Sequence, residues 1–161
     1  FLMGGAMKKA FWLPVLFGLF LTTGCLTVSS PDYKAAAQTT LARMDAAYQR
    51  RNFEDFMYYV APKTDFDRER FATAVENDIN AFVYVRCQTR VAQIGLRHAN
   101  PQDDTVVGLI AKVEFSREIE TYRYGRKSVS GETVLTFKVG ENGDLKLTDM
   151  EEPAPYGLIV P

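Results

Sequence analysis

The stretch that decides the fold is VYVRCQTRVAQIGL, residues 83–96. In its first half, apolar and small side chains alternate with polar ones, which is typical of a strand with one covered face. After Val91 the apolar side chains shift by one position, to Ala92, Ile94 and Leu96. A shift of one inside a continuous strand is what a β-bulge produces. The pattern therefore predicts a long, bulged strand.

Upstream of residue 83 the apolar side chains recur every three or four residues, the spacing of amphipathic helices. The first helix is expected to begin at Ser30 and Pro31, because serine caps helices and proline fits their first turn. Asn52 and Asp67 are expected to cap a second, short helix and a third. The two longer helices present apolar stripes: Tyr33, Ala37, Leu41, Met44 and Tyr48 in the first, and Phe71, Val75, Ile79 and Phe82 in the third.

Downstream of residue 96 the alternation of strands continues to the end of the domain. One strand is expected to run from residue 107 to Tyr124, and Asn142 and Gly143 predict a hairpin turn before the last strand. The side chains that we assign to the covered face of the strands are Val83, Val85, Cys87, Thr89, Val107, Leu109, Ala111, Val113, Thr133 and Leu135. No carboxylate is among them.

Three helices followed by a meander of antiparallel strands predict an α+β domain in which the helices cover one sheet face. Over about residues 31–150 this order resembles the NTF2-like and SnoaL-like family. Besides the apolar stripe of the first helix, the resemblance rests on RNFEDF at residues 51–56 and on NGDLKLTD at residues 142–149. It implies a cone, with N-terminal helices packed on a curved, bulged antiparallel sheet.

The N-terminal part of the chain has a different composition. Lys8 and Lys9 precede an apolar run at residues 10–21, and no further charged residue occurs before Asp32. As a helix the run would span about 18 Å, less than the roughly 30 Å hydrocarbon core of a membrane. The layout is typical of a secretory signal with Met7 as its start. The alternative is an uncleaved signal anchor in the inner membrane.

The end of this segment, LTTGC at residues 21–25, resembles the lipobox of bacterial lipoproteins. The resemblance implies that residues 1–24 are a cleaved signal peptide and that Cys25 carries the lipid, with acyl chains such as palmitate. Residues 25–30 would then form a lipidated tether, and residues 31–161 the NTF2-like domain. Because Leu26 follows the cysteine, the resemblance implies an outer-membrane lipoprotein that faces the periplasm of a Gram-negative bacterium.

Charge and residue counts exclude several classes of function. Lys and Arg number 19 and Asp and Glu 20, a formal net charge of -1. Proteins that bind nucleic acid need clustered positive charge in excess, so no nucleic-acid partner is expected. His98 is the single histidine, and it is expected in a surface loop because one histidine cannot build a metal site alone. Cys87 is expected to be a buried, inert thiol. We predict no metal and no cofactor.

Two groups of side chains are candidates for binding. Hydroxyl and apolar groups inside the cone form a possible pocket for a small apolar ligand: Met44, Tyr48, Tyr59, Cys87, Thr89 and Thr133. Aromatic and cationic groups at a hairpin end form a possible surface contact: Tyr122, Arg123, Tyr124, Arg126 and Lys127. The alternatives are ordinary packing and a solvated hairpin. The tail at residues 151–161 either docks on a partner or folds back onto its own sheet.

The functional hypothesis is an envelope lipoprotein whose non-catalytic NTF2-like module binds a small ligand or a protein, in a scaffold or accessory role. Its partners would be the membrane, through the lipid, and a protein or a second copy. The alternative that the resemblance implies is a cavity enzyme, an isomerase, dehydratase or hydrolase. An acid–base catalyst needs a titratable group that faces the substrate. Glu114, Glu118 and Glu132 fall on the opposite strand faces, so we predict no catalytic residue.

Overall fold

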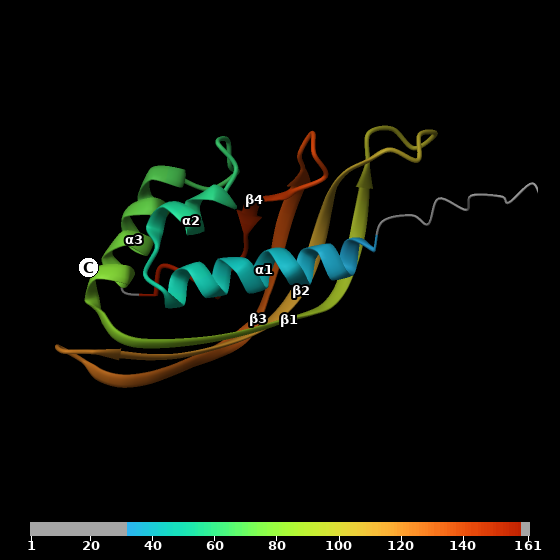
Figure 1. Ribbon diagram of the computed structural model, residues 1–161. Coiled ribbons are helices and arrows are strands. Elements are labelled where there is room, and N and C mark those ends of the chain that lie inside the picture. Colours follow the sequence, from blue (N-terminus) through green and yellow to red (C-terminus); the bar gives the residue numbers. More distant parts are fainter. Residues whose placement is uncertain (1–31, 159–161) are drawn as a thin grey trace, which may run out of the picture. The chain divides into compact units, whose positions relative to one another are not determined.

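The computed structural model describes residues 32–158, which form three helices and one four-stranded antiparallel sheet (Figure 1). The helices are α1 (Tyr33–Gln49), α2 (Phe53–Tyr58) and α3 (Arg68–Ala81). The strands are β1 (Phe82–His98), β2 (Val106–Thr121), β3 (Gly125–Val139) and β4 (Leu145–Met150), and they lie in the sheet in chain order. The predicted signal peptide, Cys25 and the tether lie outside the described residues. Within these residues no helix is long and apolar enough to cross a membrane.

A polar side chain caps each helix at its start. The Asp32 carboxylate accepts a hydrogen bond from the Ala35 amide at 3.0 Å. Helix α1 therefore begins after Asp32, and the predicted start at Ser30 was wrong. Asn52 and Asp67 cap α2 and α3, which confirms both predictions. The predicted stripes of α1 and α3 are buried, apart from the half-buried Tyr33.

The long first strand is bulged as predicted, since its pairing with β2 shifts between Val91 and Gln93. Two members of the predicted interior face are wrong: Val83 is 37% exposed and Val107 is 40% exposed. Both lie beside register shifts near the ends of β1, where the alternation changes phase. The second strand ends at Thr121 rather than Tyr124, because the chain turns there and resumes at Gly125 with a φ of +67°.

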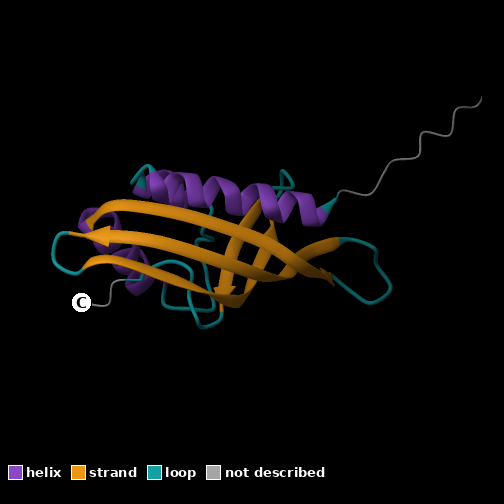
Figure 2. Cartoon of the chain, turned by 90° about the horizontal axis from the view of Figure 1, so that it is seen from below, coloured by secondary structure: helices purple, strands orange, loops and turns teal. Residues whose placement is uncertain are grey.

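Helix α1 runs alongside strand β1, as Figure 2 shows. Strand β1 is an edge strand, and exposed edges can pair with other chains. Side chains of α1 bind this edge: Gln38 Nε2 donates to the Thr89 carbonyl, and Gln38 Oε1 accepts from the Val91 amide, both at 2.8 Å. Lys34 Nζ donates to the Ala92 carbonyl at 2.9 Å. These bonds protect the edge and fix α1 relative to β1.

The core lies between the bent sheet and the helices (Figure 1). Its centre is aromatic: the ring of Tyr48 packs on Phe56, Phe82 and Tyr156 with centroids 5.3 to 5.6 Å apart. Tyr156 belongs to the segment that follows β4, and it is 1% exposed. Of the two fates considered for the tail, its described part folds back onto its own domain.

Candidate functional site

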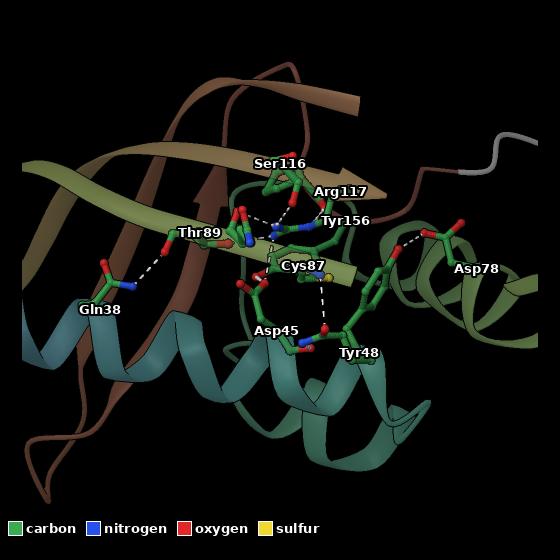
Figure 3. Close-up of polar contacts among 12 residues, drawn as sticks. Gln38, Asp45, Tyr48, Asp78, Cys87, Thr89, Ser116, Arg117 and Tyr156 are labelled. Atoms are coloured by element: carbon green, nitrogen blue, oxygen red, sulfur yellow. Dashed lines mark hydrogen bonds and ion pairs between the residues drawn. The ribbon is translucent and has the colours of Figure 1, made fainter. Parts of the chain in front are cut away.

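A charged side chain, Arg117, lies at the centre of the interior with its side chain 0% exposed. Its guanidinium has five N–H donors and makes five hydrogen bonds, of 2.9 to 3.1 Å. The acceptors are the Asp45 carboxylate, the Thr89 hydroxyl, and the carbonyls of Gln88, Ser116 and Pro155. Arg117 comes from β2, and Figure 3 shows its side chain close to Thr89, Asp45 and Tyr156. A buried charge is tolerated when it is paired and hydrogen-bonded in this way.

The partner carboxylate, Asp45, projects from the middle of α1 toward the sheet (Figure 3). Its Oδ1 accepts from Arg117 Nη2 at 2.9 Å and from the Tyr156 hydroxyl at 2.8 Å. Burial raises the pKa of Asp45, and the charge of Arg117 and hydrogen bonds from Thr89 and Tyr156 oppose this rise. We call these four residues, Asp45, Thr89, Arg117 and Tyr156, the interior network.

A second buried carboxylate, Asp78 of α3, lies next to the interior network. Its Oδ2 accepts hydrogen bonds from the Tyr48 hydroxyl and from the amide of Leu158, the latter at 2.6 Å. Burial raises the pKa of Tyr48 and of Tyr156 well above 10, and the neighbouring carboxylates add to this rise. Both phenols therefore remain neutral donors at any physiological pH.

The segment that follows β4, residues 151–158, closes the interior, and we call it the C-terminal strap. It contains no helix or strand. Tyr156 inserts between the helices and the sheet. The centroid of its ring lies 4.8 Å from the ring centroid of Phe56 and 4.9 Å from Cζ of Arg117. Every buried side-chain nitrogen or oxygen in the described part of the chain has a hydrogen-bond partner. The chain itself thus supplies the hydrogen-bond partners of these buried polar atoms.

The structure separates the residues of the predicted pocket. Thr89 belongs to the interior network, and Tyr48 and Cys87 lie beside it (Figure 3). Met44 is fully buried in the core. Tyr59 instead lines a surface hollow of about 310 Å³ beside α1 and α2. Thr133 is buried on β3 and donates to the Glu151 carbonyl at 2.6 Å. Whether any of them binds a ligand stays a prediction.

Cys87 is half-buried on β1, and its amide donates to Gln49 Oε1 at 3.3 Å. Burial raises the pKa of the Cys87 thiol to about 12. A thiol with so high a pKa is a poor nucleophile at neutral pH. Among the residues that the structure describes, no group of three or more histidine, cysteine or acidic side chains is arranged to hold a metal ion.

The predicted surface contact lies at the turn between β2 and β3. Tyr122 is 94% exposed and Tyr124 is 53% exposed. Arg123 and Lys127 stack on the ring of Tyr124, with their cationic groups 5.2 and 5.4 Å from its centroid. Arg126 pairs with two carboxylates, Glu118 at 3.4 Å and Glu120 at 3.3 Å. The turn therefore exposes two aromatic rings among stacked cations.

The sequence interpretation missed the charged members of this interior, although their positions carried a signal. Asp45 lies four residues after Leu41 and three before Tyr48, so it belongs to the same helix face. Asp78 falls in the stripe of Phe71 and Val75 by the same spacing. Buried charges are rare, so a stripe of apolar residues does not by itself indicate them. Along β2, Arg117 likewise continues the alternation of buried residues.

Comparison with known proteins supports the fold and nothing narrower. No protein-family model matches the sequence, and no curated protein matches it significantly. A conserved protein from Planctomyces limnophilus has a similar structure, with a TM-score of 0.61 at 12% identity over 73% of this chain and 92% of that chain. A ketosteroid isomerase-like protein from Erwinia carotovora atroseptica has a TM-score of 0.56 at 6% identity, over 75% of this chain and 95% of that chain.

A scytalone dehydratase-like protein from Novosphingobium aromaticivorans gives a TM-score of 0.58 at 10% identity, over 73% of this chain and 80% of that chain. Like these neighbours, the described domain packs helices on one face of a curved antiparallel sheet. The chain therefore has the α+β, NTF2-like cone fold that the sequence predicted.

Proposed function

We propose that this chain is a non-catalytic binding module, held at the bacterial envelope by a lipid on Cys25, that contacts a protein partner. The observation that carries the proposal is the filled interior. Tyr156 and Arg117 occupy the space between helices and sheet where a cavity enzyme would hold its substrate, and both donate hydrogen bonds to Asp45. A pocket for a small molecule needs open volume with unsatisfied polar groups.

The exposed hairpin end favours a protein partner. Phe82 pairs with Thr121, and Arg51, which follows the last turn of α1, donates to the Val83 carbonyl at 2.6 Å. The hairpin therefore lies at the C-terminal end of α1, opposite Asp32, which caps the N-terminal end of this helix. Helix α1 has 17 residues and is about 25 Å long. In an anchored protein, Tyr122 would be available to a partner in the periplasm.

A specific observation favours the alternative, a cavity enzyme. Two carboxylates, Asp45 and Asp78, lie inside the cone, and two similar structures are described as ketosteroid isomerase-like and scytalone dehydratase-like. The filled interior favours a binding module, whereas the inward carboxylates are groups that a cavity enzyme would use. Both carboxylates accept hydrogen bonds from the chain itself, which supports the binding module.

Two measurements test the proposal. Native mass spectrometry of the purified protein should give the mass of the lipidated chain without a small molecule. A photo-crosslinking amino acid at Tyr122 should give an adduct with one protein in cells of the source bacterium, while the same group at Asn142, an exposed turn residue between β3 and β4, should not. A stoichiometric small molecule in the spectrum would favour the enzyme instead. Equal crosslinking at both positions would contradict a specific contact at the hairpin.

A further inference from the structure

The C-terminal strap is bound to the rest of the domain at three points within four residues. The Tyr156 hydroxyl donates to Asp45, the Pro155 carbonyl accepts from Arg117 Nε at 3.0 Å, and the Leu158 amide donates to Asp78. The groups that hold the strap come from three elements: Asp45 from α1, Arg117 from β2 and Asp78 from α3. The strap is therefore recognised by a set of charged groups that converge from separate elements.

The same charged groups are hard to explain as packing alone. Removing a charge from water costs free energy, and an apolar core of similar shape is usually at least as stable as a buried ion pair. Asp45 is 6% exposed, and Arg117 and Asp78 are 0% exposed. Each of the three forms a hydrogen bond with the strap. Buried polar groups that converge on one segment are characteristic of a site that recognises that segment.

The recognition is detailed for the tyrosine. Its ring meets the rings of Tyr48 and Phe56 edge-on, at 5.3 and 4.8 Å between centroids, and the Arg117 guanidinium on its face. Such edge-on contacts and cation–π stacking each add to the free energy of burial. The pocket thus fits a phenol ring together with the main-chain groups on both sides of it.

The position of the strap at the surface also allows it to detach from the domain by local opening. The first three residues of the strap, Glu151, Glu152 and Pro153, are exposed, and of these Glu151 hydrogen-bonds to β3 through its amide and carbonyl. A surface hollow of about 830 Å³ lies on one side, lined by Ala154, Tyr156 and Gly157 together with residues of α3. Another hollow, of about 260 Å³, is lined by Leu158 with residues of β2 and β3. Segments without regular structure and with few buried apolar contacts are the ones that open locally. The first residues of the strap meet this description, whereas the buried Tyr156 ring must leave the core when the strap is displaced.

We propose that the domain carries a binding site for a tyrosine-bearing peptide, which the C-terminal strap fills in cis and which a tyrosine segment of a partner protein fills when the strap is displaced. The inference rests on the proposed function as a protein-binding module and names the chemistry of its partner. The peptide must offer a phenol hydroxyl to Asp45, a carbonyl before the tyrosine to Arg117 and an amide two residues later to Asp78. A free phenol offers only the first of these groups, which favours a peptide.

The test uses the full chain with a protease recognition sequence inserted after Glu152. Cleavage after folding turns the strap into a separate peptide, and binding of a fluorescent peptide of residues 153–161 is followed by anisotropy. The uncleaved chain should bind little, because the covalently attached strap has a high effective concentration. The cleaved chain should bind the peptide with saturation. A Tyr156→Phe peptide should bind about tenfold more weakly, since it loses one hydrogen bond to a carboxylate, and a Tyr156→Ala peptide should not bind.

A matched control places the same recognition sequence at Asn142, so that cleavage breaks the chain but leaves the strap covalently attached to β4. This chain should not bind the peptide.

Unfolding of the strap-cleaved chain, followed by circular dichroism, would overturn the proposal, as would equal binding of the Tyr156→Ala peptide. Dimers that form from uncleaved chains and dissociate on addition of the peptide would support it, with a second copy as the partner. None of these outcomes changes the native mass or the crosslinks at Tyr122, so failure here is distinguishable from failure of the proposed function.

Discussion

Arg117 Nη2 lies 2.9 Å from the Asp45 carboxylate, and the two side chains are 0% and 8% exposed. This ion pair joins the inward-facing side of β2 to the middle of α1. A second arginine, Arg90, makes a slightly closer pair with Glu114 on the outer face of the same sheet, at 2.7 Å, but there the side chains are 71% and 39% exposed. The two pairs offer a direct comparison of buried and exposed charge in one protein.

We predict that Arg117→Leu lowers the free energy of unfolding by about 3 to 5 kcal/mol, because it leaves the Asp45 charge buried without its partner. Arg90→Leu, the matched control, should leave the free energy of unfolding nearly unchanged, because water already screens the exposed pair. Urea unfolding followed by circular dichroism measures both. Equal effects of the two substitutions would show that the interior ion pair is not formed as described.

The raised pKa of Asp45 predicts a specific dependence of stability on pH. The folded state holds this proton more tightly than the unfolded chain, whose pKa is near 3.8. Between that value and the raised pKa the folded state binds more protons, so the contribution of Asp45 to stability falls as the pH rises. Stability of the wild type relative to Asp45→Asn should therefore decrease with increasing pH through this window.

Urea unfolding at a series of pH values measures this difference, and the exposed Glu114→Gln serves as the control for general charge effects. A relative stability that rises with pH instead would mean that the Arg117 charge outweighs burial at this carboxylate.

Cys87 should react slowly in the native protein. Burial raises its pKa to about 12, so very little thiolate is present at pH 8, and the thiolate is the reactive form. In a Cys25→Ser variant Cys87 is the only thiol. A chromogenic disulfide reagent should label it fully in denaturant and much more slowly without it, with a native rate that increases up to high pH. Rapid native labelling at pH 8 would show that β1 exposes this side chain.

Periodicity was sufficient to predict most of the fold. The stripe that ends at Tyr48 and the phase shift after Val91 both appear in the structure as predicted. The errors lie where local exceptions override periodicity. Val83 and Val107 point outward beside register shifts, and a shift of one residue turns a side chain to the other sheet face. Such shifts depend on how two strands pair, which neither strand reveals alone.

The interior network was only partly predictable, for a different reason in each residue. Asp45 and Arg117 stand at positions that the periodicity marks as buried, so a search for polar residues within the stripes would have found them. Tyr156 had no such signal, because the C-terminal strap has no periodic structure. Its burial follows from tertiary contacts with Phe56 and Arg117, which come from segments far away in the sequence.

Cys25 lies outside the described residues, and its lipidation remains a prediction from the sequence. Each buried methylene of an acyl chain contributes about 0.8 kcal/mol to membrane binding, so two or three chains hold a domain firmly. Cys25→Ala should leave the precursor unprocessed and abolish the acyl mass in mass spectrometry of the purified protein. Cys87→Ala, a change at the other cysteine of the chain, should leave processing and acylation intact. If the wild type is itself membrane-bound and uncleaved, with no acyl mass, the N-terminal segment is a signal anchor and the proposed lipid attachment is wrong.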